Sequence, residues 1–144
     1  MEKLLYVDKY YGGSGGLEMM ERVEPVRAEL MSHLRSRFEV HRAFDFDMQI
    51  VDKLAREKGK FDALLTHFPY VDLGRSYSYR GAIANMMELK ERLPNLPVVI
   101  YTGAAPQEKA LSIFDPSNVI FKSRNVSYDA GLILNAFSRL LAKN

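Results

Sequence analysis

The stretch Val98-Val99-Ile100-Tyr101 is an unbroken run of apolar residues, and three of the four are β-branched. Similar runs lie at residues 4–7, 63–66 and 119–121, and none of them alternates between apolar and polar residues. Strands that are buried on both faces have this pattern, which is typical of parallel sheets. Residues 38–43 do alternate, so we predict a less buried strand there, at an edge of the sheet.

Apolar residues at helical spacing lie between these runs. For the first helix, residues 17–37, the predicted inward side chains are Met20, Val23, Val26, Leu30 and Leu34. Pro25 lies inside this segment, so the helix either kinks there or begins there.

Four more helices are predicted, at residues 47–58, 78–93, 106–114 and 128–143. Asp47 is a suitable N-cap for the first of these four. Met86 and Met87 are predicted to point inward, where methionine fills gaps in a core. The alternative is that this pair contributes to a partner surface.

Strand and helix thus alternate five times along the chain. This order predicts an α/β fold with a five-stranded parallel sheet and helices on both of its faces. The chain has 144 residues and 47% of them are hydrophobic, which suits a single domain over residues 1–144.

Composition excludes several classes of function. The chain has 20 basic and 18 acidic residues, a net charge of +2, which argues against a nucleic-acid-binding protein. It has no cysteine and three histidines, so disulfides, Cys-ligated zinc, iron–sulfur clusters and a His-rich metal site are not expected. With no signal-peptide pattern and no apolar run long enough to cross a bilayer, we expect a cytoplasmic protein.

Candidate site residues follow the predicted strands, because ligands of open parallel sheets bind beyond the carboxyl ends of the strands. Asp8 and Lys9 follow the first run, His67 the third strand, Thr102 the fourth and Lys122 the fifth. We expect this acid, hydroxyl and amine to converge at one end of the sheet.

These strand ends resemble the receiver domains of two-component response regulators, and the resemblance covers the whole chain. In that family, paired acids after the first strand help to hold Mg²⁺, and an Asp after the third strand accepts phosphate. A Thr or Ser follows the fourth strand and a Lys follows the fifth. By this resemblance, Asp8, Thr102 and Lys122 match the family pattern.

Two decisive positions depart from that pattern. Lys9 stands at the second acid, and His67 stands at the phospho-accepting Asp. Because Mg²⁺ prefers carboxylate oxygens, we expect no ordinary metal binding, no aspartyl phosphate and no cofactor. Ser123 replaces the usual Pro after the Lys, and Val119 replaces the usual switch aromatic. The resemblance therefore implies a degenerate receiver, or pseudo-receiver.

The roles of these two residues have alternative interpretations. His67 either forms a hydrogen bond near Asp8 or a loop carbonyl, which we favour, or itself accepts phosphate. Lys9 either pairs with Asp8 in place of the metal or points into water.

Two loops carry further candidate residues. A glycine loop of Gly12, Gly13, Ser14, Gly15 and Gly16 follows the first strand. Its amides could bind an anion, but its spacing is not that of a P-loop or a dinucleotide fingerprint, so we favour a flexible connection. After the third strand comes a loop whose residues are common in interaction hot spots, namely Tyr70, Arg75, Tyr77, Tyr79 and Arg80.

We therefore predict a signalling or protein-interaction module that works without phosphorylation and is not an enzyme. The resemblance implies a partner face over residues 106–144. It also implies a protein partner, such as a signalling kinase, an output protein or a second copy. The alternative is a flavodoxin-like domain that binds a small molecule or nucleotide, or an enzyme with His67 as general base. We expect neither a membrane nor a nucleic acid as partner.

Overall fold

The computed structural model describes residues 1–8, 16–43, 46–67, 79–103 and 114–143, in which strands and helices alternate. The strands are β1 (Lys3–Val7), β2 (Glu39–Ala43), β3 (Ala63–Thr66), β4 (Val98–Thr102) and β5 (Val119–Phe121). The helices are α1 (Gly16–Arg35), α2 (Met48–Arg56), α3 (Tyr79–Arg92) and α5 (Val126–Ala142), with a 3-10 turn η1 (Pro116–Asn118) before β5. The predicted helix at residues 106–114 lies almost entirely outside the described residues.

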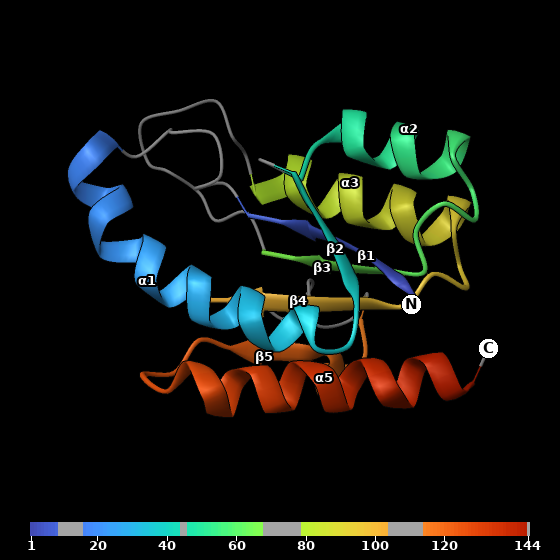
Figure 1. Cartoon of the computed structure of the whole chain (residues 1–144). Coiled ribbons are helices and arrows are strands. Elements are labelled where there is room, and N and C mark those ends of the chain that lie inside the picture. The colour runs from blue at the N-terminus through green and yellow to red at the C-terminus, as the bar shows by residue number, and fades with distance from the viewer. Residues whose placement is uncertain (9–15, 44–45, 68–78, 104–113, 144) are drawn as a thin grey trace.

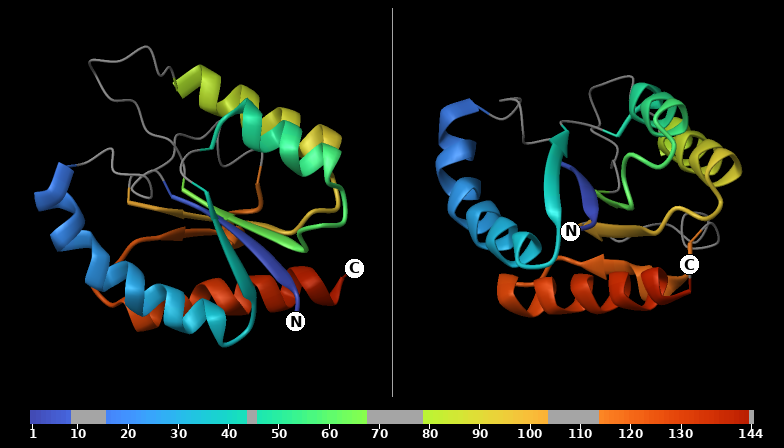
Figure 2. Two further views of the ribbon diagram at one scale, coloured as in Figure 1. Left: turned by 45° about the horizontal axis from the view of Figure 1, so that its top comes forward. Right: turned by 45° about the vertical axis from the view of Figure 1, so that its right-hand side comes forward.

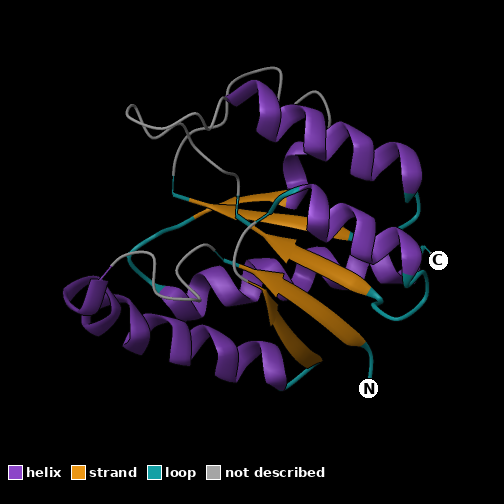
Figure 3. Cartoon of the chain, turned by 90° about the horizontal axis from the view of Figure 1, so that it is seen from above, coloured by secondary structure: helices purple, strands orange, loops and turns teal. Residues whose placement is uncertain are grey.

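All neighbouring strands of the sheet are parallel, in the order β2-β1-β3-β4-β5 (Figure 1). Figure 3 shows the strands side by side, with helices in front of and behind them. The order reverses between β1 and β3, since β2 lies on the outer side of β1. This confirms the predicted five-stranded parallel α/β fold and places a topological switch point at the ends of β1 and β3.

The helices form one layer on each face of the sheet (Figure 2). On one face, α1 and α5 cover a cluster that includes Leu4, Leu65 and Phe137. On the other, α2 and α3 cover a cluster that includes Leu64 and Met86. The sheet thus has two separate apolar cores, as expected when strands are buried on both faces.

The burial of each strand follows its sequence pattern. Every side chain of β3 and β4 is buried, and so are those of β1 after Lys3. In contrast, β2 is the predicted edge strand, and its Glu39, His41 and Arg42 side chains are exposed. Charged side chains on an edge strand discourage pairing with another chain.

The predicted N-cap of α2 is confirmed. The carboxylate of Asp47 accepts a hydrogen bond from the amide of Ile50 at 3.0 Å. Asn125 caps α5 in the same way, by accepting from the amide of Tyr128 at 3.1 Å. Both caps satisfy an amide that the first turn of a helix would otherwise leave without a partner.

Among the predicted inward residues of α1 whose side chains the structure describes, Val26 is wrong, while Met20 and Val23 lie outside the described side chains. Val26 is 47% exposed, whereas the neighbouring Arg27 is 5% exposed and shares the buried side with Leu30 and Leu34. The helix also does not begin at Pro25, since α1 runs through this residue from Gly16 and curves along its length (Figure 1). Adjacent residues of a helix are rotated by about 100° about its axis. The positions of Leu30 and Leu34 alone therefore allowed either Val26 or Arg27 on the inward side.

A second inward prediction fails in α3. Met86 is fully buried, as expected, but Met87 is 56% exposed. Leu89 takes the inward position instead, three residues after Met86. Among the helices of the described segments, none is both long and apolar enough to cross a membrane.

Candidate functional site

Asp8 and His67 lie at the switch point of the sheet, directly after β1 and β3. The amide of Asp8 donates to the carbonyl of Ala43 at 3.0 Å, and that of His67 donates to the carbonyl of Val7 at 3.3 Å. These bonds continue the two pairings of β1 by one residue on each side. Both side chains are buried, with 3% of Asp8 and 7% of His67 exposed.

Asp8 forms a buried ion pair with Arg27 of α1. The guanidinium donates to Oδ2 of Asp8 from Nη2 at 2.7 Å and from Nε at 3.1 Å. The phenol of Tyr6 donates to the same oxygen at 3.0 Å. Because both charged groups are almost fully buried, solvent screens this pair little. The sequence-based options for Asp8 did not include Arg27.

The sequence does contain a signal for this pair. Arg27 stands three residues before Leu30 and seven before Leu34, which is the spacing of a single helix face. A basic residue on the apolar face of a helix, opposite a strand that ends in Asp, indicates a buried ion pair. Val26 concealed the signal because it fits the same periodicity.

Lys122 and Thr102 meet at the ends of β4 and β5. The amide of Lys122 donates to the carbonyl of Thr102 at 2.8 Å. The Thr102 side chain is buried. The ammonium of Lys122 lies 5.3 Å from the centre of the Tyr101 ring, a cation–π contact. The Lys122 side chain therefore lies against β4 on the side of Tyr101.

Tyr101 belongs to a second buried polar network, which the sequence analysis missed. Its phenol donates to Oδ2 of Asp129 at 2.6 Å, and Asp129 is fully buried in the first turn of α5. Ser123 supplies two more donors to this carboxylate, from its amide at 2.9 Å and from its hydroxyl at 2.6 Å. These bonds fix the connection from β5 to α5.

This network changes the acidity of Tyr101. Burial and the hydrogen bond to the Asp129 carboxylate raise the pKa of the Tyr101 phenol far above its usual value, and the negative charges of Asp129 and Asp8 add to the shift. The folded protein therefore keeps this phenol neutral, as a donor to Asp129.

Other candidate residues are only partly described or lie outside the description. Gly16 is the first residue of α1, and Tyr79 and Arg80 begin α3. Outside the described residues lie Lys9, Gly12, Gly13, Ser14, Gly15, Tyr70, Arg75 and Tyr77. The expected roles of the two loops thus stay predictions.

Comparison with known proteins identifies the architecture. No protein-family model matches the chain, and no curated protein matches its sequence. Solved structures do match. A CheY-like receiver domain from Methanospirillum hungatei JF-1 aligns with a TM-score of 0.63 at 14% identity, over 100% of this chain and 99% of that one. A receiver domain protein from Clostridium thermocellum aligns with a TM-score of 0.59 at 16% identity, over 96% of each chain.

A third match is the beryllofluoride-activated NtrC4 receiver domain dimer, with a TM-score of 0.61 at 16% identity over 97% of this chain and 99% of that one. The chain has the receiver-domain fold. At these identities the likeness concerns architecture, so the chemistry of the strand ends depends on the residues present in this chain.

The described residues at the strand ends do not fit a magnesium site. Asp8 is the carboxylate that follows β1, and its Oδ2 already accepts three hydrogen bonds, two of them from a cation. Across the described segments, no group of three or more His, Asp or Glu side chains is arranged to hold a metal ion. Oδ2 of Asp8 thus binds a guanidinium, whereas a divalent cation prefers carboxylate oxygens that are not already paired with a cation.

Substitutions in the buried pair of Asp8 and Arg27 should cost much stability, and their effects should not be additive. Asp8→Asn or Arg27→Met should each lower the free energy of unfolding by about 3–5 kcal/mol, because each leaves one buried charge uncompensated. The double variant should lose much less than the sum of the two. Urea unfolding of all four proteins gives the coupling energy.

The pair of Arg37 and Glu2 is a matched control, because its atoms are also 2.7 Å apart but both side chains are substantially exposed. Glu2→Gln and Arg37→Met should each cost at most about 1 kcal/mol. Equal costs for the buried and the exposed pair would contradict the strong coupling of Asp8 and Arg27.

The Tyr101 network predicts an alkaline effect on stability. Tyr101→Phe should cost about 1.5–3 kcal/mol near neutral pH, since a donor to a buried carboxylate is lost. A raised pKa in the folded state stabilises fully below the unfolded pKa of tyrosine, about 10, and this contribution declines above it. The stability gap between wild type and Tyr101→Phe should therefore narrow above about pH 10.

Urea unfolding at several pH values measures this gap, and Tyr128→Phe serves as the control because Tyr128 is 60% exposed. A stability gap that stays constant up to high pH would contradict a raised pKa of the Tyr101 phenol in the folded protein.

Proposed function

We propose that this chain is a receiver-like protein-interaction module whose state does not depend on aspartyl phosphorylation. The bonding of Asp8 carries the proposal. In the receivers that the sequence resembles, the acids at this strand end help to hold Mg²⁺, whereas here Arg27 and Tyr6 bind the carboxylate of Asp8. His67 stands where those receivers have their phospho-accepting Asp, and its side chain is buried.

The position of Lys122 supports the same proposal. By resemblance this lysine matches the Lys that follows the fifth strand of receivers, and here its ammonium lies over the Tyr101 ring. The connection that follows it is held by Ser123 and Asp129, which are in the same network as Tyr101. Asp8 and Lys122 thus each contact a side chain of the protein itself, Arg27 and Tyr101 respectively.

The partner face is proposed to include β5 and α5, within residues 106–144. Three of the large apolar side chains that are most exposed in the described residues lie there: Phe121, Tyr128 and Leu132 are 51%, 60% and 38% exposed. Tyr128 and Leu132 are one helical turn apart on α5. We assign a second copy of the chain as the partner, since the similar NtrC4 receiver domain is a dimer.

Phosphorylation gives the first test. Incubation with acetyl phosphate and Mg²⁺ should leave the intact mass of the protein unchanged, because the residue directly after β3 is His67 rather than a carboxylate. A receiver with an acceptor Asp is the positive control.

An adduct that is lost in alkali and persists in His67→Ala would mean that a carboxylate accepts phosphate and would contradict the proposal. An adduct that survives alkali, is lost in acid and disappears in His67→Ala would instead assign phosphate transfer to His67.

Self-association gives the second test. Sedimentation over a range of concentrations should show a dimer that Leu132→Glu abolishes, because the new carboxylate would be buried without a partner in the interface. Met87→Glu is the matched control, since Met87 is 56% exposed on α3, on the opposite face of the sheet. A wild-type chain that stays monomeric, or equal effects of the two variants, would exclude a homodimer through this face.

A further inference from the structure

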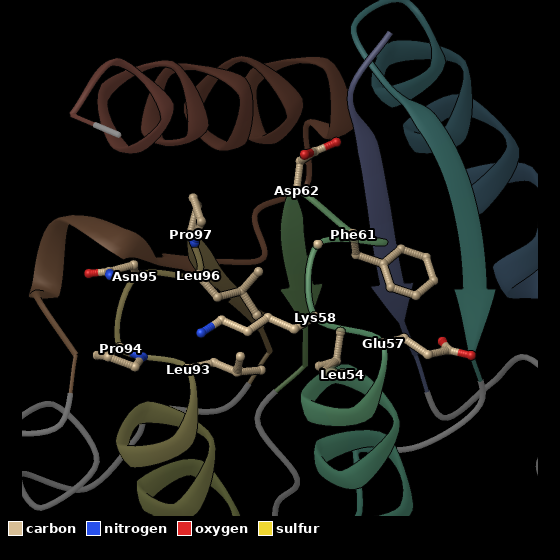
Figure 4. A pocket seen from close by; sticks show the side chains of 11 residues that line it. Leu54, Glu57, Lys58, Phe61, Asp62, Leu93, Pro94, Asn95, Leu96 and Pro97 are labelled. Atoms are coloured by element: carbon tan, nitrogen blue, oxygen red, sulfur yellow. The ribbon is translucent and has the colours of Figure 1, made fainter.

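Two pockets lie side by side around the turn from α3 to β4, at the end of the sheet opposite Asp8. They share Leu93, Pro94 and Leu96 of this turn. The first, shown in Figure 4, lies between this turn and the turn from α2 to β3. The second lies between α3, η1 and the last turns of α5, and has a volume of about 300 Å³. We call the second one the α3–α5 pocket.

The α3–α5 pocket has a mixed lining, one part of which is formed by apolar side chains. Leu93 and Val98 are buried in it, and Leu96, Phe114 and Leu140 are half-buried. Its volume is at the lower end of the range for small-molecule sites, about 300–1,000 Å³. This size suits a single alkyl chain of medium length.

The rim of this pocket is positively charged. Lys90 of α3, Arg139 of α5 and Lys143 after α5 line it, against the single carboxylate of Asp115 among the described lining residues. Asp115 is engaged locally, since its Oδ1 accepts from the amide of Ser117 at 2.9 Å and from the hydroxyl at 2.8 Å.

Two of these cations, Lys143 and Arg139, affect the acidity of Asp115. The two hydrogen bonds from Ser117 lower the pKa of the Asp115 carboxyl, and the charges of Lys143 and Arg139 lower it further. Arg139 also donates to the carbonyl of Ser117 at 3.5 Å, which brings its guanidinium over η1. Two cations are thus within electrostatic reach of one side of the pocket.

The first pocket has the opposite charge balance. Lys58 is its one described cation, beside the carboxylates of Glu57 and Asp62. In Figure 4 the Lys58 side chain extends across the pocket toward the turn from α3 to β4. The two neighbouring pockets thus share an apolar ridge but differ in charge, which allows a direct comparison.

From this combination we infer that the α3–α5 pocket binds a small amphipathic anion, with an apolar body against Leu93, Leu96 and Leu140 and a carboxylate held by Arg139 and Lys143. Guanidinium and ammonium groups form their strongest hydrogen bonds with such anions. The inference does not rest on the proposed receiver-like function: Arg139, Leu140 and Lys143 lie within residues 106–144, but they are not among the exposed apolar side chains proposed for the dimer.

Three probes with the same alkyl chain test the inference. Sodium octanoate, octanol and octylamine are titrated separately into the ¹⁵N-labelled chain, and amide chemical shifts are followed. Octanoate should cause saturable shifts at Asn118, Leu140 and their neighbours. Octanol should bind at least about tenfold more weakly, since it lacks the charge, and octylamine should not bind.

Variants locate the binding. Arg139→Gln with Lys143→Gln should weaken octanoate binding at least about tenfold, and both side chains are exposed, so the fold should be retained. Lys58→Gln is the matched control in the neighbouring pocket and should leave the affinity unchanged. Leu132→Glu should leave it unchanged as well, which separates this site from the proposed dimer.

Three results would overturn the inference: octanoate shifts that do not saturate, octanol that binds as tightly as octanoate, or an equal loss of affinity in Lys58→Gln.

Discussion

The buried ion pair between Asp8 and Arg27 is the interaction on which the arrangement of the strand ends depends. It joins the carboxyl end of the central strand β1 to the helix that packs on one face of the sheet. Two charges in a nearly dry environment are favourable only when each remains next to the other. The rotation of α1 about its axis, and with it the choice of Arg27 over Val26 as the inward residue, follows from this requirement.

Much of the architecture was predictable because apolar patterning determines it. The uninterrupted runs that became β1, β3 and β4 are buried throughout or nearly so, and the alternating run became the exposed edge strand β2. Asp47 was predictable as an N-cap because the first turn of a helix needs a local acceptor. These features depend on neighbours in sequence or on burial alone.

The site was less predictable because its bonds join distant residues. Arg27 meets Asp8 across 19 positions, and Tyr101 meets Asp129 across 28. Periodicity reports which side of a helix is apolar, but a buried basic residue on that side looks like an interruption of the pattern. The inward prediction for Met87 was wrong for the opposite reason. Met87 is apolar and adjacent to the inward residue Met86, so it fits the helical pattern although its side chain is exposed.

The donors of Ser123 have a consequence for any attempt to engineer this chain. Its amide and hydroxyl both bind the fully buried carboxylate of Asp129. Proline has no amide hydrogen and no hydroxyl, so placing the residue usual for receivers at position 123 would leave Tyr101 as the one remaining donor of this network. Proline at position 123 would therefore need a coordinated replacement of Asp129 in α5, because this single exchange would leave a buried charge with too few hydrogen-bond donors.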